Sequence, residues 1–227
     1  MVSDSGDPQN ESAQRKPQRS SLRERRRLET TAEISSAALD LFEDRGVDST
    51  TVAEIAAAAG VSQRTFFRYF PTKEAAAFVE EPDYVAVLEE WAMCPEPLDN
   101  PFADLLDVLQ KATVAMASDK ATRRQLRLFR LEQDNPGLGV GRAGQEQVHN
   151  DRLKSALSRR SKHRYTDYEF ATMVRVSRAL VDSAVFEWLT RLQAGQPANL
   201  EAIFSHNREV VGLAMLGKKK PSSPQGS

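Results

Sequence analysis

Several features that would point to other classes of protein are scarce in this sequence. Cys94 is the sole cysteine, which excludes an intramolecular disulfide framework. No apolar run approaches the length of a membrane span, and the Ser-, Asp- and Arg-rich start has no apolar stretch typical of a signal peptide. We therefore expect a cytoplasmic protein that does not enter the membrane.

Residues that commonly carry catalysis or bind metals are also sparse. His149, His163 and His206 have no partners at the spacing of a metal site or a catalytic triad, so we expect each at the surface or at a helix cap. Glu80-Glu81 has the character of solvated charge, and no positive residue adjoins Cys94 to activate its thiol, which disfavours a redox sensor. The sequence therefore predicts no enzyme, no metal site and no cofactor.

What the chain does contain is helical periodicity over most of its length, without a strand pattern or an internal repeat. We expect an all-α fold. Changes of composition divide it into four parts. These are a disordered basic arm (1–20), a three-helix head (21–73), a larger helical domain (74–217) and a disordered polar tail (218–227).

The net charge is −1, but the positive charge is unevenly placed. Residues 15–27 are rich in Arg and Lys and contain only Glu24 against them. A local basic segment on a nearly neutral protein favours a directed contact with a polyanion, through residues such as Arg23 and Arg26. The alternative is a solvated tail that aids solubility.

The stretch from Thr50 to Lys73 has the signals of two short helices joined by a tight turn. Thr51 followed by Glu54 has the spacing of a capping box, Gly60 is suited to end the first helix, and Ser62 to cap the second. On the second helix Phe66 and Phe70 are four residues apart and share one face, which we expect to be buried. The pattern predicts a helix-turn-helix unit with a recognition helix.

The residues off that buried face carry the groups that reach base edges and phosphates. Gln and Arg can bond adenine and guanine bidentately, so we expect Gln63 and Arg64 to read bases. Thr65 and Tyr69 are better suited to phosphate, and Lys73, a cation at a helix start, suggests a nearby anion. The alternative for Lys73 is a side chain extending into water. The predicted DNA contacts are Thr51, Ser62, Gln63, Arg64, Thr65, Phe67, Tyr69 and Lys73, with Arg23 and Arg26.

The run GVSxxTFFRYFPTKE, preceded by LFEDRG, resembles the DNA-binding end of the tetracycline-repressor (TetR) family over about residues 22–78. This resemblance implies a repressor that binds double-stranded operator DNA and leaves it when a small molecule binds the C-terminal domain. It also implies that Lys73 contacts phosphate. Phe67 departs from the commoner family pattern, which has tyrosine, so apolar contact with thymine methyl or sugar is its remaining role, or else partial packing within the head.

The C-terminal helices are long and carry wide apolar stripes. Two such helices can pair with the same two of a second copy in a four-helix interface, and a homodimer would read a palindrome with two recognition helices. The alternative is that these helices only close the core of the monomer. The predicted dimer contacts are Phe170, Val174, Val181, Val185, Phe204 and Val211.

Aromatic and sulfur side chains of this domain are the candidates for a ligand pocket, although such stripes more often pack as plain core. They are Tyr84, Trp91, Phe102, Met116, Phe129 and Trp188. FFRYFPTKE and RLFRLEQDNPGL are similar to an actinobacterial branch of the family that includes the mycofactocin-system regulator, and this implies an acyl-CoA-like or lipophilic effector. The rival hypothesis is a ligand-free DNA-associated protein of the same fold.

Overall fold

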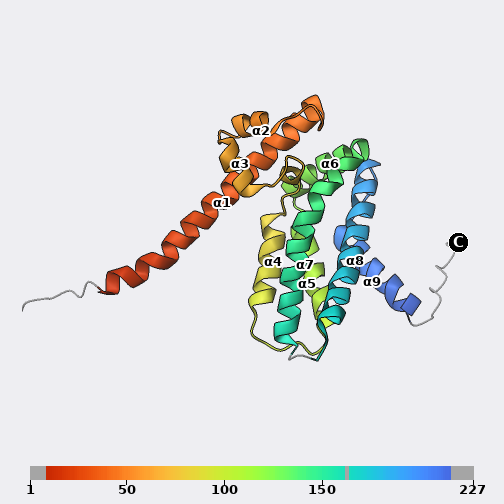
Figure 1. Cartoon of the computed structure of the whole chain (residues 1–227). Helices are drawn as coiled ribbons and strands as arrows, with labels where there is room; N and C mark the ends of the chain where they lie inside the picture. Colours follow the sequence, from red (N-terminus) through yellow and green to blue (C-terminus); the bar gives the residue numbers. More distant parts are fainter. Residues whose placement is uncertain (1–8, 162–163, 216–227) are drawn as a thin grey trace, which may run out of the picture. The chain divides into compact units, whose positions relative to one another are not determined.

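A computed structural model describes residues 9–161 and 164–215 of the chain (Figure 1). Every regular element in these residues is a helix, so the predicted all-α fold is confirmed. The chain separates into two units between Val79 and Glu80, whereas we predicted the boundary after Lys73. None of the described helices combines the length and the apolar character that a membrane crossing requires.

The first unit, the head, contains the three helices that the sequence predicted and then a short 3-10 turn. Its elements are α1 (Gln9–Arg45), α2 (Val52–Ala58), α3 (Gln63–Tyr69) and η1 (Ala75–Ala77). We expected the first helix to begin near Ser21 after a disordered arm, but residues 9–20 already belong to α1, and residues 1–8 lie outside the described part. Residues after Lys73 form η1 rather than the start of a long helix.

Local capping chemistry explains where the short helices begin and end. The Thr51 hydroxyl accepts from the Glu54 amide at 3.3 Å, and the Thr51 amide donates to Glu54 Oε2 at 2.9 Å, which completes the capping box. Gly46 and Gly60 follow α1 and α2 with φ of 84° and 66°, a conformation that glycine adopts without a Cβ clash. The predicted capping box and the predicted end of α2 at Gly60 are confirmed.

The second unit, the body, is a bundle of six helices and one 3-10 turn in the described residues. They are α4 (Pro82–Met93), α5 (Pro101–Ala115), α6 (Asp119–Asp134), η2 (Pro136–Gly139), α7 (Val140–Arg160), α8 (Asp167–Gln193) and α9 (Leu200–Met215). The helices α4, α7 and α8 run side by side, and α5 packs against α4, α8 and α9 (Figure 1). The predicted tail 218–227 lies outside the described residues.

Two prolines and a second capping box set the starts of the long helices. Pro82 and Pro101 occupy the first turn of α4 and α5, where a missing amide hydrogen costs nothing. Thr166 and Glu169 form a capping box at the start of α8. Buried side chains from α4, α5, α7, α8 and α9 then meet in one core, in which Leu105, Leu109, Leu157 and Phe204 are fully buried.

A polar cluster at the start of the body differs from the sequence expectation. His149, expected at the surface, is buried, and its Nδ1 lies 3.0 Å from Glu80 Oε1. Its ring stacks on Tyr84, whose hydroxyl accepts a 2.8 Å hydrogen bond from Arg178. Glu80 is therefore an exposed carboxylate that is also held by a hydrogen bond from the buried His149. Glu80 and His149 are too far apart in the sequence for a local pattern to reveal their contact.

The pKa of Glu80 provides a test of this cluster. Burial acts to raise it, but the hydrogen bond from His149 and the charges of His149, Arg178 and Arg152 outweigh burial and lower the pKa below 4.5. Because the folded-state pKa is the lower one, the stabilisation is fully present above pH 4.5 and is lost as the pH falls through the folded-state value. We expect Glu80→Gln to lower the unfolding midpoint in urea at neutral pH and to have progressively less effect on acidification. A deficit that is the same at every pH would contradict this account.

Candidate nucleic-acid interface

The recognition helix α3 depends on its buried side. At seven residues it is too short to be stable alone in water, so packing must hold it. Phe66 is 0% exposed and Phe70 is 3% exposed, with ring centroids 5.8 Å apart. Both rings belong to the core of the head, together with the fully buried Ile55 of α2. This packing fixes which side of α3 faces outward.

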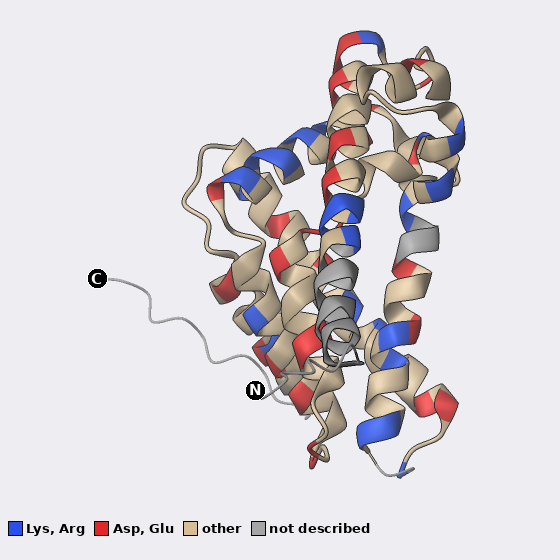
Figure 2. Ribbon diagram, turned by 90° about the vertical axis from the view of Figure 1, so that its left-hand side faces the viewer, with Lys and Arg blue, Asp and Glu red and all other residues tan. Residues whose placement is uncertain are grey.

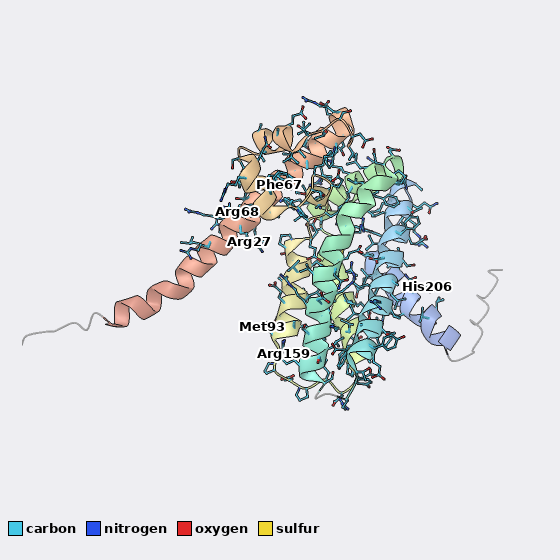
Figure 3. The ribbon with its side chains drawn as sticks, viewed as in Figure 1. Arg27, Phe67, Arg68, Met93, Arg159 and His206 are labelled. Carbon is cyan, nitrogen blue, oxygen red and sulfur yellow. The ribbon has the colours of Figure 1, made fainter. Side chains whose placement is uncertain are left out.

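The outward side of α3 carries two pairs of residues, each pair four apart. Gln63 and Phe67 form one pair, and Arg64 and Arg68 form the other, and all four side chains are exposed. The Phe67 ring is 55% exposed although it touches Phe66 edge to face at 5.5 Å. Figure 3 shows the Phe67 and Arg68 side chains extending from α3. Among the described residues, no hydrogen bond holds the side chain of Gln63 or Arg64, so both are available to a ligand.

Arg68 was not among the predicted contacts. Its guanidinium lies over the ring of the half-buried Tyr69, 5.1 Å from the centroid, which holds it near the outward side of the helix. The four-residue spacing from Arg64 was the signal that placed it on this side.

The hydroxyl groups near α3 are largely engaged inside the head. The Thr51 hydroxyl donates its one hydrogen to Glu54 Oε2 at 2.8 Å. This hydroxyl therefore has no hydrogen left to donate to DNA, where we predicted a contact for Thr51. Ser62 Oγ accepts from the Thr65 amide at 3.1 Å and lies 3.0 Å from Thr65 Oγ1. One of these two hydroxyls donates to the other, which leaves one hydrogen for an outside acceptor.

Lys73 requires a correction. Its ammonium donates to the carbonyl oxygens of Val47 at 2.7 Å, Thr50 at 2.9 Å and Asp48 at 3.4 Å. The alternative of a side chain extending into water is wrong, and the phosphate contact stays a prediction. The anion-like partner that its position suggested is a group of backbone carbonyls within the head.

The basic segment continues into the described part of α1. Arg23 and Arg26 of α1 are both exposed, and Figure 2 shows Lys and Arg residues in blue along α1. Arg25 is paired with Glu29 at 2.9 Å. A row of exposed guanidinium groups on a helix is suited to phosphate oxygens.

Residues 34–76, from the second half of α1 to η1, match the model of the bacterial regulatory proteins of the tetR family. A relative from Mycobacterium tuberculosis (strain ATCC 25618 / H37Rv) is 28% identical over 84% of this chain and 93% of its own length. It carries the name mycofactocin biosynthesis transcriptional regulator MftR. The head of this chain is a TetR-family DNA-binding domain.

Two further comparisons accompany this match. The HTH-type transcriptional regulator TcmR of Streptomyces glaucescens is 30% identical over 60% of this chain and 62% of its own. FadR of Thermus thermophilus, a TetR-family repressor solved with lauroyl-CoA, is 23% identical and covers 86% of this chain and 100% of its own, with a TM-score of 0.46. That score is too low to transfer anything from FadR to this chain.

The predicted pocket residues lie in the core of the body or pack against it. Tyr84, Phe129 and Trp188 are buried there, and the other three are half-buried and pack around them. Trp188 also lines a groove of about 260 Å³ with Leu192 and Leu200. The arrangement agrees with the plain-core alternative for most of the six, and their part in ligand binding stays a prediction.

The residues predicted as dimer contacts do not form an exposed surface. Phe170, Val174, Val181 and Phe204 are at most 2% exposed, and Val185 and Val211 pack against the same core. The apolar stripe that we assigned to a second copy is the side on which α8 and α9 close the monomer.

The outward side of α8 and α9 has a different composition. It includes Phe186, which is 60% exposed and meets Phe129 edge to face at 5.5 Å, and Val210 of α9. A groove of about 700 Å³ lies between the two helices. Ser183 and Glu187 of α8 and Ala202 and His206 of α9 are among its lining residues. The exposed His206 is labelled in Figure 3.

The neighbours Phe66 and Phe67 give a matched test of the two sides of α3. Phe66→Ala should destabilise the head by about 3–5 kcal/mol because it empties a fully buried site. Phe67→Ala should change stability by less than about 0.5 kcal/mol, since the ring is mostly exposed, but should weaken DNA binding. Urea unfolding and fluorescence anisotropy with operator DNA measure the two effects. Unchanged affinity in Phe67→Ala would remove this ring from the interface.

Proposed function

We propose that this regulator is a repressor that binds a palindromic operator as a homodimer and is released by a small-molecule effector. The observation that carries the proposal is the outward side of α3. Two arginines, a glutamine and an exposed phenylalanine lie there, on a helix whose other side is packed into the head. An α-helix fits the major groove, where each base pair has its own pattern of donors and acceptors. One such helix contacts few base pairs, so two on a two-fold axis supply the specificity.

The groups on α3 suggest a division of roles. Gln63 and Arg64, in the first turn of the helix, are placed to read adenine and guanine. Phe67 supplies apolar contact for a thymine methyl or a sugar. Arg68 and the hydroxyl hydrogen left on the Ser62–Thr65 pair are suited to phosphate, as is Tyr69. Arg23 and Arg26 of α1 add phosphate or minor-groove contacts.

Arg64→Ala should relax specificity at one base position by about 1–3 kcal/mol, because a bidentate contact to guanine is lost. Selection of binding sites from a randomised DNA pool by the purified variant and the wild type measures this directly. The matched control is Arg175→Ala, which removes an exposed arginine from α8 in the body and should leave the selected sequence unchanged. Identical selected sequences from Arg64→Ala and wild type would exclude Arg64 as a base reader.

For the homodimer, we propose the outward side of α8 and α9 as the interface. Phe186 and Val210 are exposed apolar residues of these helices, and a groove lies between the helices; we propose that a second copy covers this side with the same patch. Interfaces of this kind are typically centred on a few aromatic anchors, and Phe186 is the aromatic residue here.

Phe186→Glu should therefore shift the protein from dimer to monomer in sedimentation velocity, because a carboxylate would be buried without a partner. Its secondary structure should be retained, since the side chain is 60% exposed within one copy. Met93→Glu is the control, because Met93 is 80% exposed on α4 and lies outside the proposed interface (Figure 3). A dimer that survives Phe186→Glu would place the interface elsewhere.

The effector that we propose is acyl-CoA-like or otherwise lipophilic, in keeping with the similarity to the mycofactocin branch. A ligand that binds one arrangement of the body better than another shifts the equilibrium toward it, and DNA affinity changes by that difference. A thermal-shift comparison of acyl-CoAs, lipids and drugs tests this, since a bound ligand raises the melting temperature. Stabilisation by none of these classes would favour the ligand-free DNA-associated alternative. Under both hypotheses we propose that the protein is cytoplasmic and is not an enzyme.

A further inference from the structure

One nitrogen of the His149 ring is left unused by the contacts of the polar cluster in the body. The residue is 6% exposed, and its Nδ1 lies 3.0 Å from Glu80 Oε1. The other ring nitrogen, Nε2, is buried and has no hydrogen-bond partner within residues 9–161 and 164–215. A buried polar atom without a partner destabilises the folded state, so few of them persist in a protein without a use.

The bond to Glu80 decides which chemistry Nε2 offers. A carboxylate only accepts hydrogen bonds, so the hydrogen of the neutral imidazole lies on Nδ1. Nε2 then carries a free lone pair and acts as an acceptor. The partner that satisfies it is therefore a group with a hydrogen to donate.

The ring of Tyr84, which stacks on His149, supplies the complementary group. The two ring centroids are 5.9 Å apart, and the ring planes differ by 27°. The Tyr84 oxygen accepts from Arg178 at 2.8 Å, and this bond does not use the hydroxyl hydrogen. Burial raises the pKa of Tyr84, so the hydroxyl keeps this hydrogen at neutral pH. The two stacked side chains therefore offer one acceptor and one donor.

The surroundings of this pair are apolar on one side and reach solvent on the other. Leu88 and Leu153 follow Tyr84 and His149 by four residues on α4 and α7, and both are buried in the core of the body. Glu80, the first residue of the body, has a side chain that is 37% exposed. The cluster therefore leads from solvent inward to the apolar core.

We infer that His149 and Tyr84 bind the hydroxyl group of an apolar alcohol or phenol. The ligand hydroxyl donates to His149 Nε2 and accepts from the Tyr84 hydroxyl, while its carbon skeleton lies against the core. A fatty acyl chain and a thioester have no hydrogen to donate, so this pair selects a lipophilic molecule that carries a hydroxyl group. The inference rests on the proposed response to an effector and specifies the chemistry of that effector.

Matched pairs of small probes test the inference on the full-length protein. 1-Naphthol and 1-methoxynaphthalene share a ring system, and 1-octanol and 1-methoxyoctane share an alkyl chain. Each ether can accept a hydrogen bond but cannot donate one. Isothermal titration calorimetry without DNA should show at least one hydroxyl probe binding about tenfold more tightly than its ether, because the ether leaves Nε2 without a donor.

Two variants at position 149 separate the two ring nitrogens. His149→Asn places an amide near the position of Nδ1 and has no group at that of Nε2, whereas His149→Gln places an amide near Nε2. The preference for the hydroxyl probe should disappear in His149→Asn and be kept at least in part in His149→Gln. Tyr84→Phe should weaken the hydroxyl probe and its ether by a similar factor, since both accept from Tyr84. The control is Val148→Ala, which alters a neighbouring side chain that is 55% exposed and should change none of these affinities.

Other outcomes would overturn the inference. If neither hydroxyl probe binds more tightly than its ether, the inference is wrong and a bound water is the better partner for Nε2. A preference that persists in His149→Asn would place the ligand hydroxyl elsewhere. If His149→Asn fails to fold by circular dichroism, the probe pairs on the wild type and on Tyr84→Phe still decide.

The effector role is measured separately, by anisotropy with operator DNA. A probe that binds through His149 without releasing DNA would reject that role while leaving the binding site in place.

Discussion

The burial of Phe66 is the constraint on which the head depends. A seven-residue helix has too few internal hydrogen bonds to persist in water, so α3 exists because one of its sides is packed into the head. That same packing decides which residues remain outside. Gln63, Arg64, Phe67 and Arg68 are presented to solvent because Phe66 packs on the other side of the helix. Fold and binding surface therefore have one physical cause. A change at Phe66 alters both, whereas a change at an exposed residue such as Phe67 alters only the surface.

The elements of the head could be predicted from sequence because their signals are local. Thr51 with Glu54, Gly60 and Ser62 each act within four residues, and each has the predicted role in the structure. Contacts made across the fold could not be predicted in this way. Lys73 meets carbonyls more than twenty residues earlier in the chain, in the turn that follows α1. The same local view missed the pairing of Glu80 with His149.

The body shows why an apolar stripe does not by itself identify an interface. Periodicity located α8 and α9 correctly, but a stripe packed on its own core and a stripe packed on a second copy have the same spacing. Burial separates the two. Phe170 and Phe204 are enclosed within the body, whereas Phe186, on the opposite side of α8, remains exposed. The exposed aromatic residue outside the stripe is therefore the one on which we base the proposed dimer interface.

The central claim is that α3 lies in the major groove with its outward residues against base edges. Methylation interference on a selected operator tests it most directly, because dimethyl sulfate modifies guanine N7 in the major groove and adenine N3 in the minor groove. The account predicts that methylated guanines in each half-site block binding. Interference confined to adenine N3, with every guanine N7 tolerant of methylation, would contradict it.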